Sequence, residues 1–161
     1  MSRPSQGSQP EPPSDSGSGE SIVASSPLPP PDRSGDAGND YRAAVELVRA
    51  GKHEDAVVAL RAFIARYPRH DYADNAQYWL GETFYARKSY GEAASAFRAV
   101  VERWPAGNKA PDALLKLGFT LLMMGDGQKG RAVLTQVTEH YPGTDAARLA
   151  EGRLSALKEG K

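Results

Sequence analysis

Residues 125–130, GDGQKG, have the G-x-G-x-x-G spacing of loops that cradle phosphate groups with backbone N–H groups. In that chemistry the loop follows a β-strand and opens a helix, so that the phosphate meets the helix N-terminus. Here the apolar stretch LLKLGFTLLMM comes directly before the loop, and its spacing is helical. We therefore predict a turn between two paired helices and no nucleotide cofactor.

The three histidines, His53, His70 and His140, are the residue types best suited to binding a metal ion. Zinc sites require several His or Cys ligands at close spacing, and the chain has no cysteine. Because each histidine falls in a different predicted element, we expect no metal site.

A polar cluster at His70, Asp71 and Asp74 has the residue types of an acid–base site. Its position between two predicted helices favours an exposed loop, with Asp74 near the cap of the next helix. No Ser, Cys or Lys nucleophile has an obvious base beside it. The sequence therefore predicts no catalytic residues and no enzyme.

The elements that position these residues follow from a repeated pattern. RYPRHDYADNAQYWLG at 66–81, RWPAGNKAPDALLKLG at 103–118 and a fainter HYPGTDAARLAEGRLS at 140–155 recur at intervals of 37 residues. A fixed period in this range is typical of stacked supersecondary units. Each aromatic-Pro pair predicts the end of a helix, because proline does not continue a helix and restricts the residue before it.

Apolar residues recur at three- and four-residue steps throughout the repeats, which predicts helices and no strands. The first helices of the units are expected at 41–50, 74–87 and 111–124, with a further helix at 145–157. The second helices are expected to begin at His53, Tyr90 and Gln128 and to end before each aromatic-Pro pair. Isolated helices of this length are marginal in water, so stability has to come from stacking.

Two glycines, Gly81 and Gly118, fall in the middle of predicted helices, where glycine costs about 1 kcal/mol relative to alanine. A close crossing with the second helix of the same unit would compensate for that cost. We expect Ala56, Ala93 and Gly130 to be the small partners at these crossings.

Composition divides the chain into two regions. Residues 1–39 contain ten Ser, eight of the twelve Pro and five Gly, which predicts a disordered linker without a core. Residues 40–161 are rich in Ala, Leu, Val, Arg and Glu and are predicted to form the one folded domain. PLPPPDR at 27–33 includes the P-x-x-P spacing of polyproline ligands, although a stiffened part of the linker is the simpler interpretation.

Charge and hydropathy exclude two classes of partner. Residues 40–161 hold 18 Lys and Arg and 15 Asp and Glu, spread along the chain, so we expect no nucleic-acid partner. MSRPSQGSQP lacks the apolar region of a signal peptide, and no stretch reaches the roughly 18 apolar residues of a spanning helix. We expect no membrane insertion and no export signal in these residues.

The tetratricopeptide repeat (TPR) signature of Leu-Gly, Tyr, Ala, Phe and Pro is matched by Leu80-Gly81, Phe84-Tyr85, Tyr90, Ala93, Phe97 and Pro105. Each copy is three residues longer than the usual length of about 34, and the surplus lies in RHDYADNA and AGNKAPDA. With this lengthened connection, residues 40–158 resemble the C-terminal domain of the YbgF/CpoB family, the Tol-Pal system cell-division coordinators of Gram-negative envelopes.

The resemblance implies an all-α fold, a TPR-type right-handed superhelix of three helical hairpins and a C-terminal capping helix. It also implies a non-catalytic adaptor in the periplasm whose partners are proteins, namely TolA and the peptidoglycan synthesis machinery. Members of the family join a signal peptide and a trimerising coiled coil to the repeats through a polar linker. Only the linker is recognisable here, so trimerisation and the oligomeric state stay open.

In stacked helical hairpins the first helices line a concave side. The repeat signature places a mostly apolar set of residues there, and exposed aromatics in a concavity are typical of a binding surface. Packing between neighbouring hairpins would explain several of them instead. Glu82 and Lys116 would set the polarity of a bound peptide or helix. The expected partner-binding groove consists of Tyr41, Val45, Val48, Tyr78, Trp79, Glu82, Tyr85, Leu115, Lys116, Phe119, Leu122 and Met123.

Three alternatives fit a helical repeat. A TPR scaffold of outer-membrane protein assembly would carry a lipobox cysteine, which is absent. A self-associating structural repeat module would expose apolar terminal helices, whereas ALKEGK ends the chain with polar residues. A cytosolic chaperone adaptor that holds C-terminal carboxylates would need Asn in YRAAVELVR, which has none.

Overall fold

The computed structural model describes residues 37–160, and the rest of the predicted linker lies outside this range. The described residues form seven helices and no strand, which confirms the all-α prediction. No helix in this part of the chain has the length and apolar character needed to cross a membrane. The helices are α1 (Ala37–Arg49), α2 (His53–Arg66), α3 (Ala73–Ala86), α4 (Tyr90–Arg103), α5 (Ala110–Met123), α6 (Gly127–His140) and α7 (Asp145–Lys158).

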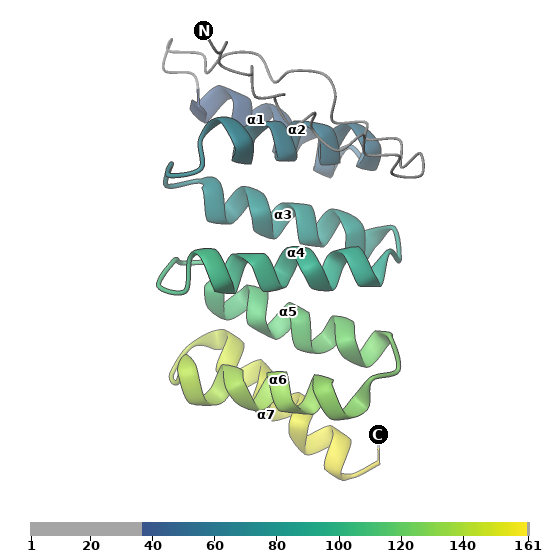
Figure 1. Cartoon of the computed structure of the whole chain (residues 1–161). Coiled ribbons are helices and arrows are strands. Elements are labelled where there is room, and N and C mark those ends of the chain that lie inside the picture. Colours follow the sequence, from purple (N-terminus) through teal and green to yellow (C-terminus); the bar gives the residue numbers. More distant parts are fainter. Residues whose placement is uncertain (1–36, 161) are drawn as a thin grey trace, which may run out of the picture.

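Consecutive helices pair and stack in chain order, from α1 and α2 at one end to α7 at the other (Figure 1). The pairs α1/α2, α3/α4 and α5/α6 are the three predicted hairpins, and α7 packs against both α5 and α6. One hydrophobic core runs through the stack, from Ala37 in α1 to Ala150 in α7. This shared interior stabilises helices that are individually too short to persist in water.

The predicted limits of α2 to α7 are confirmed within one residue, and each second helix ends directly before its aromatic-Pro pair. The prediction for α1 is wrong at its start. Residues 37–39, which were assigned to the linker, are helical, because Ala37 is buried against the core and the packing holds an extra turn. The domain therefore begins at or before Ala37.

The two mid-helix glycines mark close crossings, as predicted, but their partners differ. A Cβ atom on Gly118 would lie 2.7 Å from Cδ2 of Leu134 and 3.5 Å from the backbone oxygen of Gly130. A Cβ atom on Gly81 would lie 2.5 Å from Cε1 of Phe97. Gly130 therefore lies beside Gly118 as predicted, and the atoms nearest to Gly81 belong to the Phe97 ring.

The turn inside each hairpin uses one residue with left-handed backbone geometry. Gly51, Lys88 and Gly125 occupy equivalent positions, with φ angles of 71°, 60° and 83°. A residue with a Cβ atom is strained in this region and glycine is not. The middle hairpin therefore carries a backbone strain that the other two avoid.

Replacing Lys88 with glycine is expected to raise the free energy of unfolding by roughly 0.5 to 1 kcal/mol, since the left-handed penalty disappears. Chemical denaturation of the full chain measures the change. Lys88→Ala is the matched control, because it removes the side chain but keeps the strained Cβ. An equal gain from both variants would assign the effect to loss of the lysine charge instead.

Candidate protein-binding surface

The spacing of the helices curves the stack towards the first helices of the hairpins. In the described residues, α1 contacts α3, α3 contacts α5, and α5 contacts α7, whereas α2, α4 and α6 make no comparable contacts with one another. An open pocket of about 450 Å³ instead lies between α2 and α4, with Phe84 of α3 among its lining residues. Because the first helices are closer together, they lie on the inner, concave side, as predicted.

Across the first two hairpins this inner side is joined by a hydrogen bond between aromatic side chains. The indole Nε1–H of Trp79 in α3 donates to the hydroxyl of Tyr41 in α1 over 3.1 Å. The Tyr41 ring also packs on Tyr72, with ring centroids 4.7 Å apart. Both Tyr41 and Trp79 are half-buried, so each stabilises the stack and still presents an edge to the surface.

Between α3 and α5 the concave side is bridged by an ion pair. Lys116 Nζ lies 3.1 Å from Glu82 Oε1, and both side chains are only about a quarter to a third exposed. The same ammonium group sits 5.1 Å from the centre of the Tyr85 ring, at cation–π distance. Lys109 lies 5.0 Å from the centre of the Tyr78 ring in the same way. The surface therefore has an aromatic end at α1 and α3 and a mixed aromatic and charged end at α3 and α5.

The phenols on this side are held in their neutral form. Burial raises the pKa of Tyr78, and the carboxylates of Glu82 and Asp112 raise it further. Burial likewise raises the pKa of Tyr41, although the hydrogen bond from Trp79 acts in the opposite direction. At neutral pH these hydroxyls are therefore polar but uncharged groups.

Two residues assigned to the groove face inward instead. Val45 and Leu115 are buried, with 6% and 5% exposure, because neighbouring first helices pack directly against one another and cover short aliphatic side chains. The groove prediction is wrong for these two, which belong to the core. Leu122 is half-buried and also packs on α6, since its Cδ2 atom lies 2.6 Å from the position of a Cβ on Gly130.

The other assigned residues reach the surface to different extents. Val48 and Phe119 are half-buried at the edge of the core. Met123 is 54% exposed and follows Lys116 and Phe119 by seven and four residues, which places all three on one face of α5. Of the residues assigned to the groove, those that are half-buried or exposed are Tyr41, Val48, Tyr78, Trp79, Glu82, Tyr85, Lys116, Phe119, Leu122 and Met123.

In the polar cluster at the α2–α3 connection, the side chains form hydrogen bonds with the backbone. Asp74, expected near an exposed cap, is 6% exposed. Its carboxylate accepts hydrogen bonds from the backbone N–H of Asn75 at 2.8 Å and of Lys109 at 3.4 Å. A Cβ atom on Gly107 would lie 2.7 Å from Asp74 Oδ2. The carboxylate therefore links the first turn of α3 to the loop between α4 and α5. The side chain of His70 instead accepts a hydrogen bond from the backbone N–H of Tyr72.

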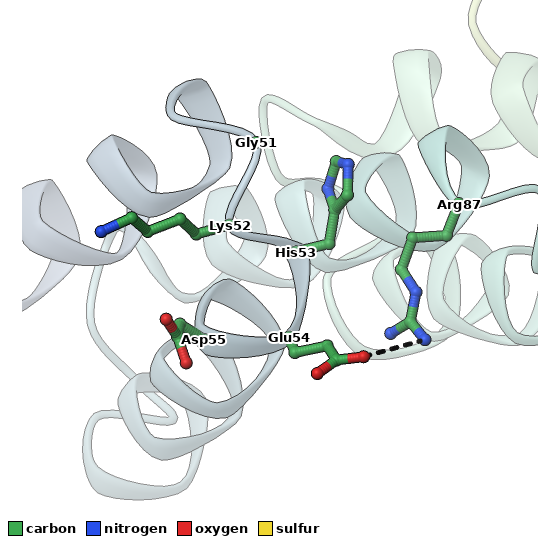
Figure 2. Close-up of a pocket in the computed structure, with 6 residues that line it drawn as sticks. All are labelled: Gly51, Lys52, His53, Glu54, Asp55 and Arg87. Carbon is green, nitrogen blue, oxygen red and sulfur yellow. Dashed lines mark ion pairs between the residues drawn. The ribbon is translucent and has the colours of Figure 1, made fainter.

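A shallow pocket of about 440 Å³ lies at the turn between α1 and α2 (Figure 2). Glu54 and Arg87 meet across it at 4.0 Å, while the side chain of Lys52 points away from Arg87 (Figure 2). His53 lies at the start of α2. Among residues 37–160 no group of three or more His, Cys, Asp or Glu side chains is placed to hold a metal ion.

The GDGQKG stretch has the predicted helix–turn–helix setting, between α5 and α6. Gly125 makes the turn, and Asp126 caps α6 by accepting a hydrogen bond from the backbone N–H of Lys129 at 3.2 Å. This hydrogen bond and the charge of Lys129 lower the pKa of Asp126. The Lys129 side chain returns to the same carboxylate at 3.3 Å. The glycines therefore serve a turn and a helix start.

Two family models described as tetratricopeptide repeat match the chain, one over residues 41–108 and the other over residues 84–154. Together they extend from α1 to α7. The chain belongs to the tetratricopeptide repeat family. TPR hairpins are modules that bind other proteins, which agrees with the open aromatic face on the first helices.

Curated proteins with similar sequences indicate a more specific relationship within the TPR family. The chain is 46% identical over 56 residues to cell division coordinator CpoB of Escherichia coli (strain K12), a match covering 34% of this chain and 21% of that protein. It is 45% identical over 47 residues to cell division coordinator CpoB of Pseudomonas putida (strain KT2440), covering 29% of this chain and 18% of that protein. The matched part spans about a fifth of these relatives. The TPR domain therefore has the resemblance to the YbgF/CpoB family that the sequence indicated.

Sequence reasoning missed Tyr72 as a surface residue. It lies in the loop before α3, is 42% exposed and stacks on Tyr41. The repeat signature covers only helical positions, so it contains no signal for a loop side chain. The one available signal was the surplus of residues after the aromatic-Pro pair, which had to fold somewhere near the next first helix.

Proposed function

We propose that the chain is a non-catalytic adaptor of the Gram-negative cell envelope whose concave face holds a peptide or helix of a partner protein. The single observation that carries this proposal is the half-buried aromatic and charged face along α1, α3 and α5. Trp and Tyr side chains with an apolar body and a polar tip are the residues that most often dominate binding energy.

The cellular setting of the proposal comes from relatives. Similarity to proteins named cell division coordinator CpoB favours a role in coordinating division. The periplasm and the Tol-Pal system are what the family resemblance implies. TolA and the peptidoglycan synthesis machinery are the partners that the family resemblance implies. TolA is the better first probe, because it is one protein, whereas the peptidoglycan synthesis machinery consists of several.

The ion pair between Lys116 and Glu82 gives the surface an internal polarity. Neither side chain is fully exposed, so a partner that covers them removes both from water together. Because the two charges already neutralise each other, a further charge buried beside them would lose its hydration without gaining a partner. We therefore expect the bound segment to be mainly apolar at this point, with its own charges at the rim.

Binding of the full chain to TolA from the same organism, measured by calorimetry, tests the proposal. Met123→Asp places an unpaired charge on the concave face and is expected to weaken binding at least about tenfold. Val58→Asp is the matched control: Val58 is 69% exposed on α2, and its replacement is expected to leave the affinity unchanged. Equal effects of the two substitutions, or no binding by the unsubstituted chain, would contradict this function.

A further inference from the structure

Aromatic rings gather at the end of the stack where α1 begins and α2 ends. The ring centroids of Tyr41 and Phe63 are 5.7 Å apart, and those of Phe63 and Tyr67 are 5.1 Å apart. His70 lies 5.9 Å from Phe63 and 5.0 Å from Tyr72. Trp79 joins them through its hydrogen bond to Tyr41. We call these six residues the aromatic cluster.

Part of the aromatic cluster is open to solvent. Phe63 is buried at the base, whereas Tyr72 is 42% exposed, and Tyr41, Tyr67, His70 and Trp79 are half-buried. The Tyr41 and Tyr72 rings stack within 4.7 Å at an angle of 30°. Surfaces lined by neighbouring aromatic side chains are the ones that bind polyproline helices.

The chain enters the domain beside this surface. Asp40, in the first turn of α1, accepts hydrogen bonds from Arg66 and from the hydroxyl of Tyr67, both at 3.1 Å. These bonds fix the start of α1 against the end of α2. Tyr41 directly follows Asp40, so Ala37, where the described chain begins, lies about one helical turn from the aromatic cluster.

We infer that the chain's own segment 27–33, PLPPPDR, docks as a polyproline helix on the aromatic cluster, over Tyr41, Tyr72 and Trp79. The segment lies outside the described residues, and only Ser34, Gly35 and Asp36 separate it from α1. Four peptide steps from Arg33 to Ala37 span at most about 14 Å. Tyr41 is then about 6 Å further along α1.

Because the connection between residues 27–33 and α1 is short, a low affinity is enough to populate the docked state. A segment tethered this closely has an effective concentration on the order of millimolar, so a millimolar affinity already populates the docked state. The four prolines also limit the cost in conformational entropy, because their φ angles are fixed before docking. The segment in polyproline form is about 22 Å long, enough to cross several rings.

This inference does not rest on the proposed function, because it can be tested on the full chain without a partner. The chain has two tryptophans, and the indole N–H groups give two separate signals in a proton–nitrogen NMR spectrum. A Trp79→Phe variant identifies the Trp79 signal. Replacing Pro27, Pro29, Pro30 and Pro31 with serine is expected to shift that signal.

Pro4, Pro10, Pro12 and Pro13 supply a control matched in number and composition. Their replacement with serine is expected to leave the Trp79 indole signal in place. Tyr72→Ala should reduce the shift caused by the replacements at 27–31, because the docking surface is then incomplete. Identical Trp79 signals in the unsubstituted chain and both serine variants would overturn the inference.

A spin label gives an independent measurement that does not depend on the aromatic variants folding. The chain has no cysteine, so Ser26→Cys provides a unique attachment site. A nitroxide there is expected to broaden the amide signals of Tyr72 and Trp79 more with the prolines present than in the serine variant at 27–31. Equal broadening in both would overturn docking. Broadening that grows with protein concentration would assign the contact to a second copy and overturn the intramolecular form.

Discussion

Replacing Gly81 with alanine is expected to lower the free energy of unfolding by about 1 to 2 kcal/mol, although alanine is the better helix former. The new Cβ atom would lie 2.5 to 2.9 Å from three atoms of the Phe97 ring. Phe97 is fully buried and packs on Tyr78, so the ring cannot move aside freely. Urea unfolding of the full chain measures the loss.

The first hairpin indicates how the clash can be relieved. Its equivalent positions are occupied by Ala44 and Leu60, both fully buried, so alanine and leucine are a compatible pair there. Gly81→Ala combined with Phe97→Leu should therefore be more stable than the sum of the two single losses predicts. We expect a coupling of about 1 kcal/mol, within the usual range for residues in contact.

Gly152→Ala is the matched control for this prediction. Gly152 also lies inside a helix, α7, but no atom approaches within 4 Å of the position of its Cβ. Alanine there is expected to stabilise the chain by roughly 0.5 to 1 kcal/mol through helix propensity alone. If Gly81→Ala stabilised the chain as Gly152→Ala does, the close crossing would not exist in solution.

The limits of the helices were predictable because they depend on local chemistry. The aromatic-Pro pairs and the three- and four-residue spacing are properties of neighbouring residues, and they located α2 to α7 within one residue. The start of α1 was not predictable, since it depends on the burial of Ala37 by residues distant in the chain. Gly81 signalled a close approach, but only coordinates show that a Phe97 ring fills it.

The candidate surface was predictable in outline and not in detail. Repeat position assigned Trp79 and Lys116 to the first helices, and both side chains contact a neighbouring first helix. It could not separate Tyr41 from Leu115, which occupy equivalent positions but differ in burial. Burial there depends on side-chain length and on what the neighbouring first helix covers. The buried carboxylate of Asp74 was likewise unpredictable, because its partner lies in the next inter-hairpin loop.

Trp79→Ala is expected to weaken binding to the partner by at least about 2 kcal/mol, or roughly thirtyfold in dissociation constant. Trp79 lies in the middle of the concave face, between Tyr41 of α1 and the Glu82–Lys116 pair of α3 and α5. A central, partly covered tryptophan is the most common kind of dominant contact in protein interfaces. Calorimetric titration with TolA measures the loss, and thermal unfolding checks that the variant remains folded.

Trp79→Phe separates the two contributions of the indole group. Phenylalanine keeps an aromatic ring but cannot donate the hydrogen bond that Trp79 makes to Tyr41 at 3.1 Å. If ring contact with the partner dominates, Trp79→Phe should retain most of the affinity that Trp79→Ala loses. If the hydrogen bond acts by holding Tyr41 in place, Tyr41→Phe should weaken binding as much as Trp79→Phe. A folded Trp79→Ala variant with unchanged affinity would place the partner elsewhere on the domain, because no other concave side chain is both central and as large.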